Sequence, residues 1–157
     1  MPGSGKSTVG RMLAQRLRCG FIDTDQLIES SRYRSLQDIV DSDGYETLRK
    51  IEEEILLDID TRDHVIATGG SAVYSEKAMA HLRAIGRIIF LYANLASLQQ
   101  RIHNLGQRGL ARRPGQTLAE LFAEREALYR NSADLTIESS SLTPEQVCTQ
   151  VLEMLGR

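Results

Sequence analysis

The first eight residues, Met-Pro-Gly-Ser-Gly-Lys-Ser-Thr, contain most of a phosphate-binding loop. Such a loop has the pattern G-x-x-x-x-G-K-[ST]. Its glycines let backbone N–H groups surround phosphate oxygens, and the following helix directs its positive end at them. Lys6 can reach the terminal phosphates of a nucleotide and the Ser7 hydroxyl can ligate Mg²⁺, so the sequence predicts a nucleotide site rather than a glycine turn that only caps a helix. The residues of this predicted site are Gly3, Ser4, Gly5, Lys6, Ser7 and Thr8.

The first glycine of that pattern would stand one residue before Met1, and no apolar strand leads into the loop. Such a strand would be expected inside a parallel sheet, with a neighbouring strand on each side. Its loss leaves unpaired backbone and apolar surface on both neighbouring strands. We therefore expect either a fragment or truncated gene product without its first strand, or a chain that folds only marginally.

Two aspartates follow the short apolar segment of residues 19–22. Asp23 could hold a water molecule of a Mg²⁺ ion bound to Ser7, because Mg²⁺ keeps most of its waters. Asp25 could accept a proton from a substrate hydroxyl. The alternative is that one aspartate only caps the helix that begins near Gln26. The neighbouring phosphate loop favours the functional interpretation.

Three basic elements and a pair of glycines are further candidates. Arg49 and Arg125 lie in acidic helical segments, where a solvated or salt-bridged arginine is the default interpretation. The Gly- and Arg-containing segment within residues 105–117 suits a lid that closes over nucleotide and excludes water, although a disordered basic loop has the same composition. Gly69 and Gly70 end an apolar strand, where they allow close approach of a ligand or simply form a turn.

Short apolar segments alternate with helical periodicity along the chain, which predicts βαβ units and a parallel sheet covered on both faces. The expected fold is therefore a three-layer αβα domain with its ligands beyond the carboxyl ends of the strands. The expected helices are 5–17, 26–30, 35–59 with a break near Gly44, 76–82, 96–104, 117–130 and 144–155, and the expected strands are 19–23, 64–70, 87–93 and 135–138.

Composition adds general limits. The 157 residues suit one domain, and a net charge of −2 gives no general attraction to nucleic acid or to anionic membranes. The apolar runs are too short for a membrane span, and two distant cysteines favour a reducing cytoplasm. We expect a cytoplasmic monomer whose partner is a small molecule, with no nucleic-acid or membrane partner.

Taken together, the motifs resemble the shikimate kinase family of small phosphate-loop kinases. The opening stretch through "FIDTDQLIE" is followed in the same order by "LRKIEE", "ATGG", "RRP" and "REALY", so the resemblance covers nearly the whole chain. It implies ATP- and Mg²⁺-dependent phosphorylation of a hydroxyl of shikimate to give shikimate 3-phosphate. It also implies one phosphate-loop kinase domain over residues 1–157, with a helical substrate-binding region at about 25–58 and a lid at about 105–117.

The resemblance also implies roles for single residues. Lys6 and Ser7 would bind phosphate and Mg²⁺, Asp23 would lie in the outer metal shell, and Asp25 would hold the substrate hydroxyls as the base. Two arginines suit bidentate recognition of the substrate carboxylate. The remaining implied roles are Arg49 and Arg125 on that carboxylate, Gly69 and Gly70 lining its pocket, Arg113 as the lid arginine near the transferring phosphate, and Arg101 near adenine.

Two departures from the family pattern leave alternatives open. Ser71 stands where the family has a third glycine, and the lid between Arg101 and Arg113 is several residues longer than usual, which also leaves Arg112 as a candidate lid arginine. These features suggest a related kinase of another small hydroxy acid, such as homoserine. The absent strand suggests a nucleotide-binding remnant without activity.

Overall fold

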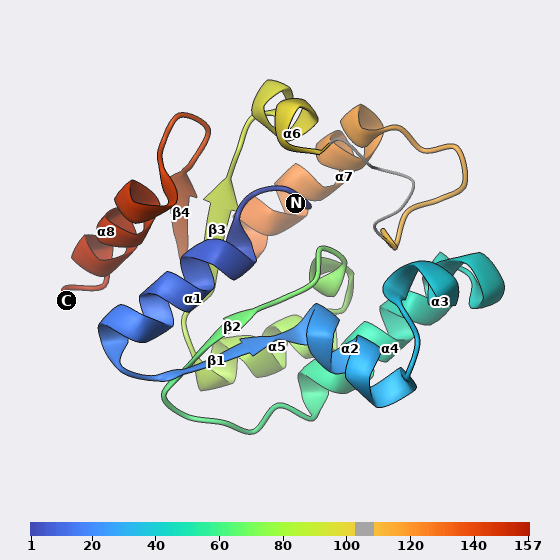
Figure 1. The fold of residues 1–157 in the computed structure, drawn as a ribbon, viewed down its shortest axis with the longest axis horizontal. Coiled ribbons are helices and arrows are strands. Elements are labelled where there is room, and N and C mark those ends of the chain that lie inside the picture. The colour runs from blue at the N-terminus through green and yellow to red at the C-terminus, as the bar shows by residue number, and fades with distance from the viewer. Residues whose placement is uncertain (103–108) are drawn as a thin grey trace.

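Four short strands form two separate parallel sheets in the computed structural model, which describes residues 1–102 and 109–157 (Figure 1). Strand β1 (Gly20–Asp23) pairs with β2 (His64–Ala67), with Gly20 opposite His64 and Asp23 opposite Ala67. Strand β3 (Ile89–Tyr92) pairs with β4 (Leu135–Glu138) in the same parallel sense. All four strands coincide with segments that the sequence predicts to be extended.

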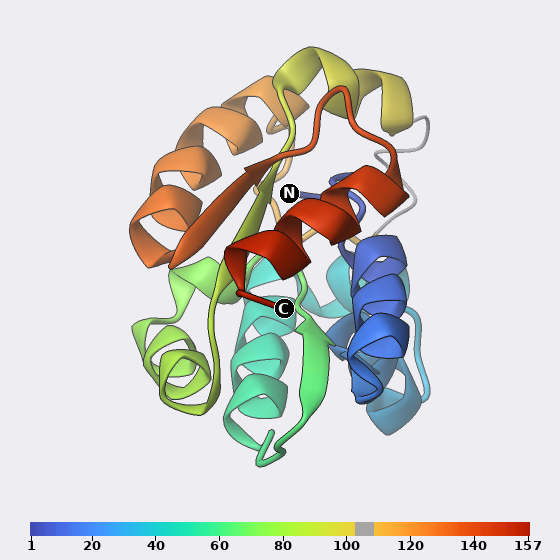
Figure 2. The ribbon, with the colours of Figure 1, turned by 90° about the vertical axis from the view of Figure 1, so that its left-hand side faces the viewer.

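Helices cover both faces of the strands, which confirms the αβα architecture. In Figure 2, α1 (Lys6–Leu17) and α8 (Pro144–Met154) lie on one side, and α5 (Glu76–Ile85) and α7 (Leu118–Ser132) lie on the other. Apolar side chains at helical spacing form the core on the first side, because α1 and α8 bury theirs against β3 and β4. That cluster consists of Val9, Leu13, Leu91, Ile137, Val147, Cys148 and Val151.

The other helices surround the carboxyl ends of β1 and β2. They are α2 (Thr24–Arg32), α3 (Leu36–Asp43), α4 (Tyr45–Leu57) and a short 3-10 turn η1 (Ala72–Tyr74), whereas α6 (Leu95–Arg101) follows β3 and packs against α7. The predicted break between α3 and α4 is confirmed at Gly44, whose φ of 85° suits glycine. The turn η1 is not predicted, because three residues carry no periodic signal, and residues 103–104 of the expected helix 96–104 lie outside the described part.

The centre of the molecule contains a gap between the two sheets. A cavity of about 340 Å³ separates β2 from β3, and apolar residues of both strands and of the helices on both sides line it. This agrees with the expectation of unpaired backbone and apolar surface at the middle of the sheet. Among the described residues, no helix has the length and apolarity that crossing a membrane requires.

Candidate active site

The phosphate loop has the backbone geometry that its glycines allow. Gly3 and Gly5 have φ values of 75° and 91°, which side-chain-bearing residues rarely adopt. A Cβ atom on Gly3 would lie 2.7 Å from a side-chain carbon of Ile102, so this position also lacks space for a side chain. Helix α1 begins at Lys6, and its amino end therefore points into the loop, as anion binding requires.

Lys6 lies beside two carboxylates in the interior of the site. Its Nζ donates a hydrogen bond of 2.9 Å to the carbonyl oxygen of Met1. Burial lowers the pKa of Lys6, and the nearby Asp25 and Glu52 oppose this effect. Burial likewise raises the pKa of Asp25, and Lys6 opposes it. Asp25 is thus more basic than an exposed aspartate, which suits a group that accepts a proton.

Asp23 caps helix α2. The backbone N–H of Asp25 donates to Asp23 Oδ1 over 3.2 Å, so the capping alternative holds for Asp23. Across residues 1–102 and 109–157, no three side chains of His, Cys, Asp or Glu gather in a way that could hold a metal ion. A Mg²⁺ ion held by few protein ligands and several waters does not need such a group, and the metal roles of Ser7 and Asp23 stay predictions.

Arg49 and Arg125 converge on one backbone oxygen, although 76 positions separate them in the sequence. Arg125 Nη2 donates to the carbonyl of Ala111 over 2.7 Å, and Arg49 Nη2 donates to the same oxygen over 3.3 Å. Arg125 is 1% exposed, and the Nε atom of Arg49 is buried without a hydrogen-bond partner among the described residues. Two cations thus share one neutral acceptor, and one of them, Arg49, keeps a buried donor without a partner among the described residues.

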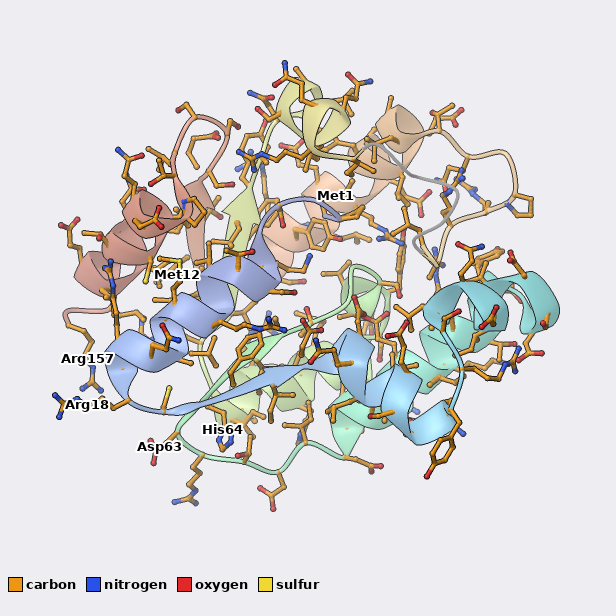
Figure 3. The ribbon with its side chains drawn as sticks, viewed as in Figure 1. Met1, Met12, Arg18, Asp63, His64 and Arg157 are labelled. Carbon is orange, nitrogen blue, oxygen red and sulfur yellow. The ribbon has the colours of Figure 1, made fainter. Side chains whose placement is uncertain are left out.

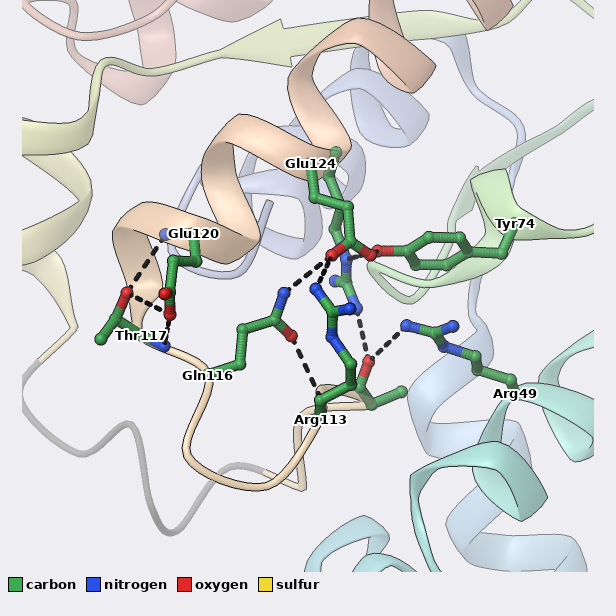
Figure 4. A network of polar contacts seen from close by, with 9 residues as sticks. Arg49, Tyr74, Arg113, Gln116, Thr117, Glu120 and Glu124 are labelled. Carbon is green, nitrogen blue, oxygen red and sulfur yellow. Dashed lines mark hydrogen bonds and ion pairs between the residues drawn. The ribbon is translucent and has the colours of Figure 1, made fainter.

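Tyr74 of η1 holds this pair in position. The guanidinium of Arg49 lies 3.7 Å from the centre of the Tyr74 ring, a cation–π arrangement. Arg125 Nε donates to the Tyr74 hydroxyl over 3.3 Å, and that hydroxyl donates to Glu124 (Figure 4). The two arginines are therefore fixed by α7, α4 and η1 together rather than free in solvent.

Gly69 and Gly70 lie where two functional groups approach the backbone. A Cβ atom on Gly69 would lie 2.3 Å from Glu52 Oε1 and 2.7 Å from Asp25 Oδ1. On Gly70, a Cβ atom would lie 2.7 Å from Arg125 Nη1. Both glycines also have fixed backbone contacts, since Gly69 N–H donates to Thr24 and the Gly70 carbonyl accepts from Tyr129. These positions require glycine because of space.

Glu52 is a buried carboxylate to which sequence analysis assigns no role. It is 3% exposed and accepts a hydrogen bond from the Ser71 hydroxyl at Oε2, whereas its Oε1 is buried without a partner among the described residues. Burial raises the pKa of Glu52 to about 7, despite the Ser71 hydrogen bond that lowers it. The spacing R-x-x-E from Arg49 to Glu52 was the available sequence signal, since it sets both on one side of α4.

The two remaining arginines lie at the edges of the site. Arg101 Nη2 donates to the carbonyls of Ser139 and Ser140 over 3.0 and 3.1 Å, next to Gly3 of the phosphate loop. Arg113 forms an ion pair of 2.8 Å with Glu124 (Figure 4), and its side chain is 62% exposed. The roles of Arg101 near adenine and of Arg113 near the transferring phosphate stay predictions, and residues 105–108 of the expected lid lie outside the described part.

The structure brings most predicted substrate residues into one small pocket of about 60 Å³. Residues 109–111 form part of its wall, and the Ala111 carbonyl lies against the arginine pair. Sequence reasoning missed Tyr74, Tyr129 and Ala111, because an aromatic residue or an alanine carries no chemical signal alone. The lining residues that sequence analysis singled out are Lys6, Asp25, Gly69, Gly70, Ser71 and Arg125.

Comparison with known proteins gives a uniform result. The chain matches the family model described as Shikimate kinase over residues 2–156. It is 36% identical to shikimate kinase 2 of Enterobacter sp. (strain 638), with 98% of this chain and 90% of that protein covered. It is 38% identical to the shikimate kinase of Pseudomonas entomophila (strain L48), with 98% and 91% covered.

Solved structures of shikimate kinases also resemble the fold of this chain. The shikimate kinase from Acinetobacter baumannii in complex with shikimate has a TM-score of 0.83 and 28% identity, with 98% of this chain and 87% of that chain covered. The shikimate kinase from Aquifex aeolicus has the same TM-score and identity, with 99% and 92% covered. The two sheets of this chain and their helices are therefore arranged as in these solved structures.

Proposed function

Since this chain belongs to the shikimate kinase family, we propose that it transfers the γ-phosphoryl group of ATP to a hydroxyl of shikimate, giving shikimate 3-phosphate. Shikimate kinases use ATP with Mg²⁺, and the positive-φ glycines and buried lysine of the phosphate loop fit such a nucleotide. The bound Mg²⁺ would supply neutralisation of phosphate charge, with Ser7 and Asp23 as the residues that hold it.

The observation that carries the proposal is the convergence of Arg49 and Arg125 beside Asp25 and Lys6. Two guanidinium groups that share one carbonyl suit the two oxygens of a carboxylate, because Arg–carboxylate contacts are strong and directional. An acid held there would have its hydroxyls on the side of Asp25, since Gly69 lies against Asp25 and the next residue, Gly70, lies against Arg125. This arrangement supports an acidic, hydroxylated substrate.

Catalysis by these residues consists mainly of positioning and charge stabilisation. Asp25 orients the acceptor hydroxyl and takes its proton, Lys6 contacts the transferring phosphate, and the arginine pair fixes the acid. We assign Arg113 to the transferring phosphate and Arg101 to the adenine end, with a lid at about 105–117 and a helical substrate region at about 25–58 in one domain. Arg112 is the other candidate for the lid role.

A panel of acceptors tests the proposal. ADP formation from MgATP is measured with the purified chain and shikimate, homoserine or gluconate, each against a reaction without acceptor. We expect turnover with shikimate alone. Turnover with homoserine and none with shikimate would instead support the kinase of another hydroxy acid, and ATP binding without any turnover would support an inactive remnant.

The comparisons do not favour these alternatives. The contacts of Ser71 also give no reason to prefer another acceptor. Its hydroxyl donates to Glu52, so the extra side chain is bound to the pocket wall. We also propose that the protein is a cytoplasmic monomer without nucleic-acid or membrane partners. Light scattering coupled to size exclusion tests the monomer, and a mass of two chains would contradict it.

A further inference from the structure

Residues 111–116 are bound to the candidate site at two points. The carbonyl oxygen of Ala111 accepts hydrogen bonds from both members of the arginine pair. Two residues further on, Arg113 Nη2 donates to Glu124 Oε2 over 2.8 Å (Figure 4). One end of this segment therefore lies in the acid site, and the other end is bound to the residue that directly precedes Arg125 in α7.

Gln116 joins the backbone of Arg113 to the same carboxylate. The backbone N–H of Arg113 donates to Gln116 Oε1 over 3.1 Å, and Gln116 Nε2 donates to Glu124 Oε2 over 2.8 Å. Gln116 is only 6% exposed, so it holds these groups from a nearly buried position. Arg113 is thus fixed through its backbone and its guanidinium, although most of its side chain is in solvent.

The other oxygen of Glu124 faces the acid site. Glu124 Oε1 accepts a hydrogen bond from the Tyr74 hydroxyl, and that hydroxyl accepts one from Arg125 Nε over 3.3 Å. The hydrogen bond from Tyr74 lowers the pKa of Glu124, so the carboxylate is charged near neutral pH and binds Arg113 as an ion pair. Glu124 therefore contacts Arg113 with one oxygen and the surroundings of the acid with the other.

This arrangement keeps Arg113 apart from the nucleotide site. The pocket that Lys6 lines includes neither Arg113 nor Glu124, although the structure describes both. Helix α7 nevertheless lies beside the phosphate loop, because Leu121 of α7 and Met1 belong to one apolar cluster, and Figure 3 shows Met1 next to this helix. The Arg113 side chain is therefore near the nucleotide site but bound to Glu124.

A substrate acid competes with Ala111 for the same donors. A carboxylate between the two guanidinium groups must take hydrogen bonds that the Ala111 carbonyl accepts, because Nη2 of Arg49 and Nη2 of Arg125 both donate to that oxygen. Of the two points of attachment, only the one at Glu124 then remains. Two contacts on one short segment strengthen each other through effective concentration, so loss of the first weakens the second.

We propose that Glu124 is a positioning residue that holds Arg113 away from the nucleotide until a substrate acid displaces Ala111 from the arginine pair. This role rests on the proposed function, in which Arg113 contacts the transferring phosphate. Without acid, Arg113 neutralises Glu124. With acid, the segment is released at Ala111, and the γ-phosphate competes for the guanidinium with charged oxygens of its own. Binding of the acid and tight binding of the nucleotide are thereby linked.

Nucleotide affinity with and without the acid tests this role. Titration calorimetry measures binding of the non-hydrolysable ATP analogue AMP-PNP with Mg²⁺ to the parent chain and to Glu124→Gln, without acid and with saturating shikimate. The glutamine keeps the size of the side chain and loses its charge. Without acid, we expect Glu124→Gln to bind AMP-PNP about fivefold more tightly than the parent. With shikimate we expect equal affinities, because the acid has already released Arg113.

Two further variants serve as controls. Glu126→Gln is matched to Glu124→Gln, because Glu126 lies on the same helix and forms an ion pair of the same length, 2.8 Å, with Arg130. The exposed fractions of the two glutamate side chains are also similar, at 28% and 30%. We expect Glu126→Gln to bind AMP-PNP as the parent does. Arg113→Ala in the Glu124→Gln background should abolish the gain, since Arg113 provides it.

Several outcomes would overturn the proposal. Weaker binding of AMP-PNP by Glu124→Gln both with and without shikimate would show a purely structural role, and unchanged affinity without acid would show that Glu124 does not restrain Arg113. A gain that persists in the Arg113→Ala background would assign the contact with phosphate to another residue. The gain without acid does not depend on the acceptor. Its presence without any shikimate turnover would therefore contradict the proposed function and still support the role of Glu124.

Discussion

Arg49 and Arg125 share the carbonyl oxygen of Ala111, at 3.3 and 2.7 Å, from helices that lie on different sides of the site. A single neutral oxygen uses only part of the donor capacity of two guanidinium groups, and Arg49 Nε has no partner among the described residues. A substrate carboxylate would replace this acceptor with two charged oxygens. This relationship supports the proposal that the pair binds the carboxylate of an acid, to which each arginine would contribute.

Loss of either arginine should weaken acid binding more than nucleotide binding. For Arg49→Ala we expect a loss of about 2–5 kcal/mol in binding of shikimate, because the partner charges are largely removed from water. Arg125→Lys keeps the charge of a nearly buried side chain and loses the two-pronged geometry, so we expect a smaller loss in the same direction. Titration calorimetry with each ligand measures both effects.

The control for these variants is Arg130→Ala. Arg130 lies on the same helix as Arg125, but it forms an exposed pair with Glu126 and should leave both affinities unchanged. If Arg49→Ala lowered ATP affinity and spared shikimate affinity, the assignment of the carboxylate site would be wrong.

Addition of one methyl group at Gly70 should damage the site through contact alone. In Gly70→Ala the new Cβ would meet Arg125 Nη1 at 2.7 Å, so the guanidinium must shift. We expect kcat/KM for shikimate to fall by about tenfold or more, since small misplacements of binding groups are costly. Gly86→Ala is the matched control, because nothing lies within 4 Å of its Cβ position. Equal effects of both changes in steady-state assays would contradict this reason for Gly70.

Burial of Glu52 should make stability depend on pH. Its pKa of about 7 in the folded protein lies above the ordinary value of 4.5, so the folded state binds the proton more tightly. The penalty for ionising Glu52 is absent below pH 4.5, grows up to about pH 7 and is constant above that. Glu52→Gln removes it, and its free energy of unfolding relative to the parent should rise by about 2 kcal/mol from about pH 5.5 to about pH 8.

Urea unfolding at both pH values measures this difference. The control is Glu54→Gln, because Glu54 is exposed and its ion pair with Arg32 lies at the surface. A parallel offset of Glu52→Gln at both pH values would show that Glu52 has no raised pKa.

Ser71 should matter more to stability at high pH than to the choice of substrate. Ser71→Ala removes the hydroxyl that donates to Glu52, so the ionised carboxylate loses a partner, and we expect a loss of about 1–3 kcal/mol at about pH 8 and less at about pH 5.5. Ser71→Gly should behave alike in urea unfolding, with the shikimate preference retained. A change of preferred acceptor in the panel assay would instead make Ser71 a determinant of specificity.

Most helices and strands can be predicted from the sequence, because the local apolar patterns agree with the elements of the folded structure. Each strand is a short apolar segment, and Gly44 separates α3 from α4 where the periodicity breaks. The backbone conformation of the phosphate loop can also be predicted locally, because Gly3 and Gly5 allow its positive φ angles. By contrast, the contact of Arg49 with Ala111 joins residues 62 positions apart, and no local pattern encodes it.

The roles of Asp23 and Glu52 could also not be decided from the sequence alone. A carboxylate at the start of a helix can serve as a cap and as an outer metal ligand, and sequence cannot separate these uses at Asp23. Glu52 looks like one of three consecutive glutamates on an exposed helix, yet it alone of them is buried. Only the approach of Gly69 and Ser71 to α4 distinguishes it.

We propose that an arginine pair positions the carboxylate of shikimate for phosphorylation beside Asp25. The most direct measurement compares initial rates of ADP formation with shikimate and with shikimate methyl ester, which has the same hydroxyls and no carboxylate charge. We expect turnover with shikimate and a kcat/KM at least about a hundredfold lower with the ester. Equal values for the two acceptors would show that the arginine pair does not hold a substrate carboxylate, and no turnover with shikimate would show that shikimate is not the acceptor.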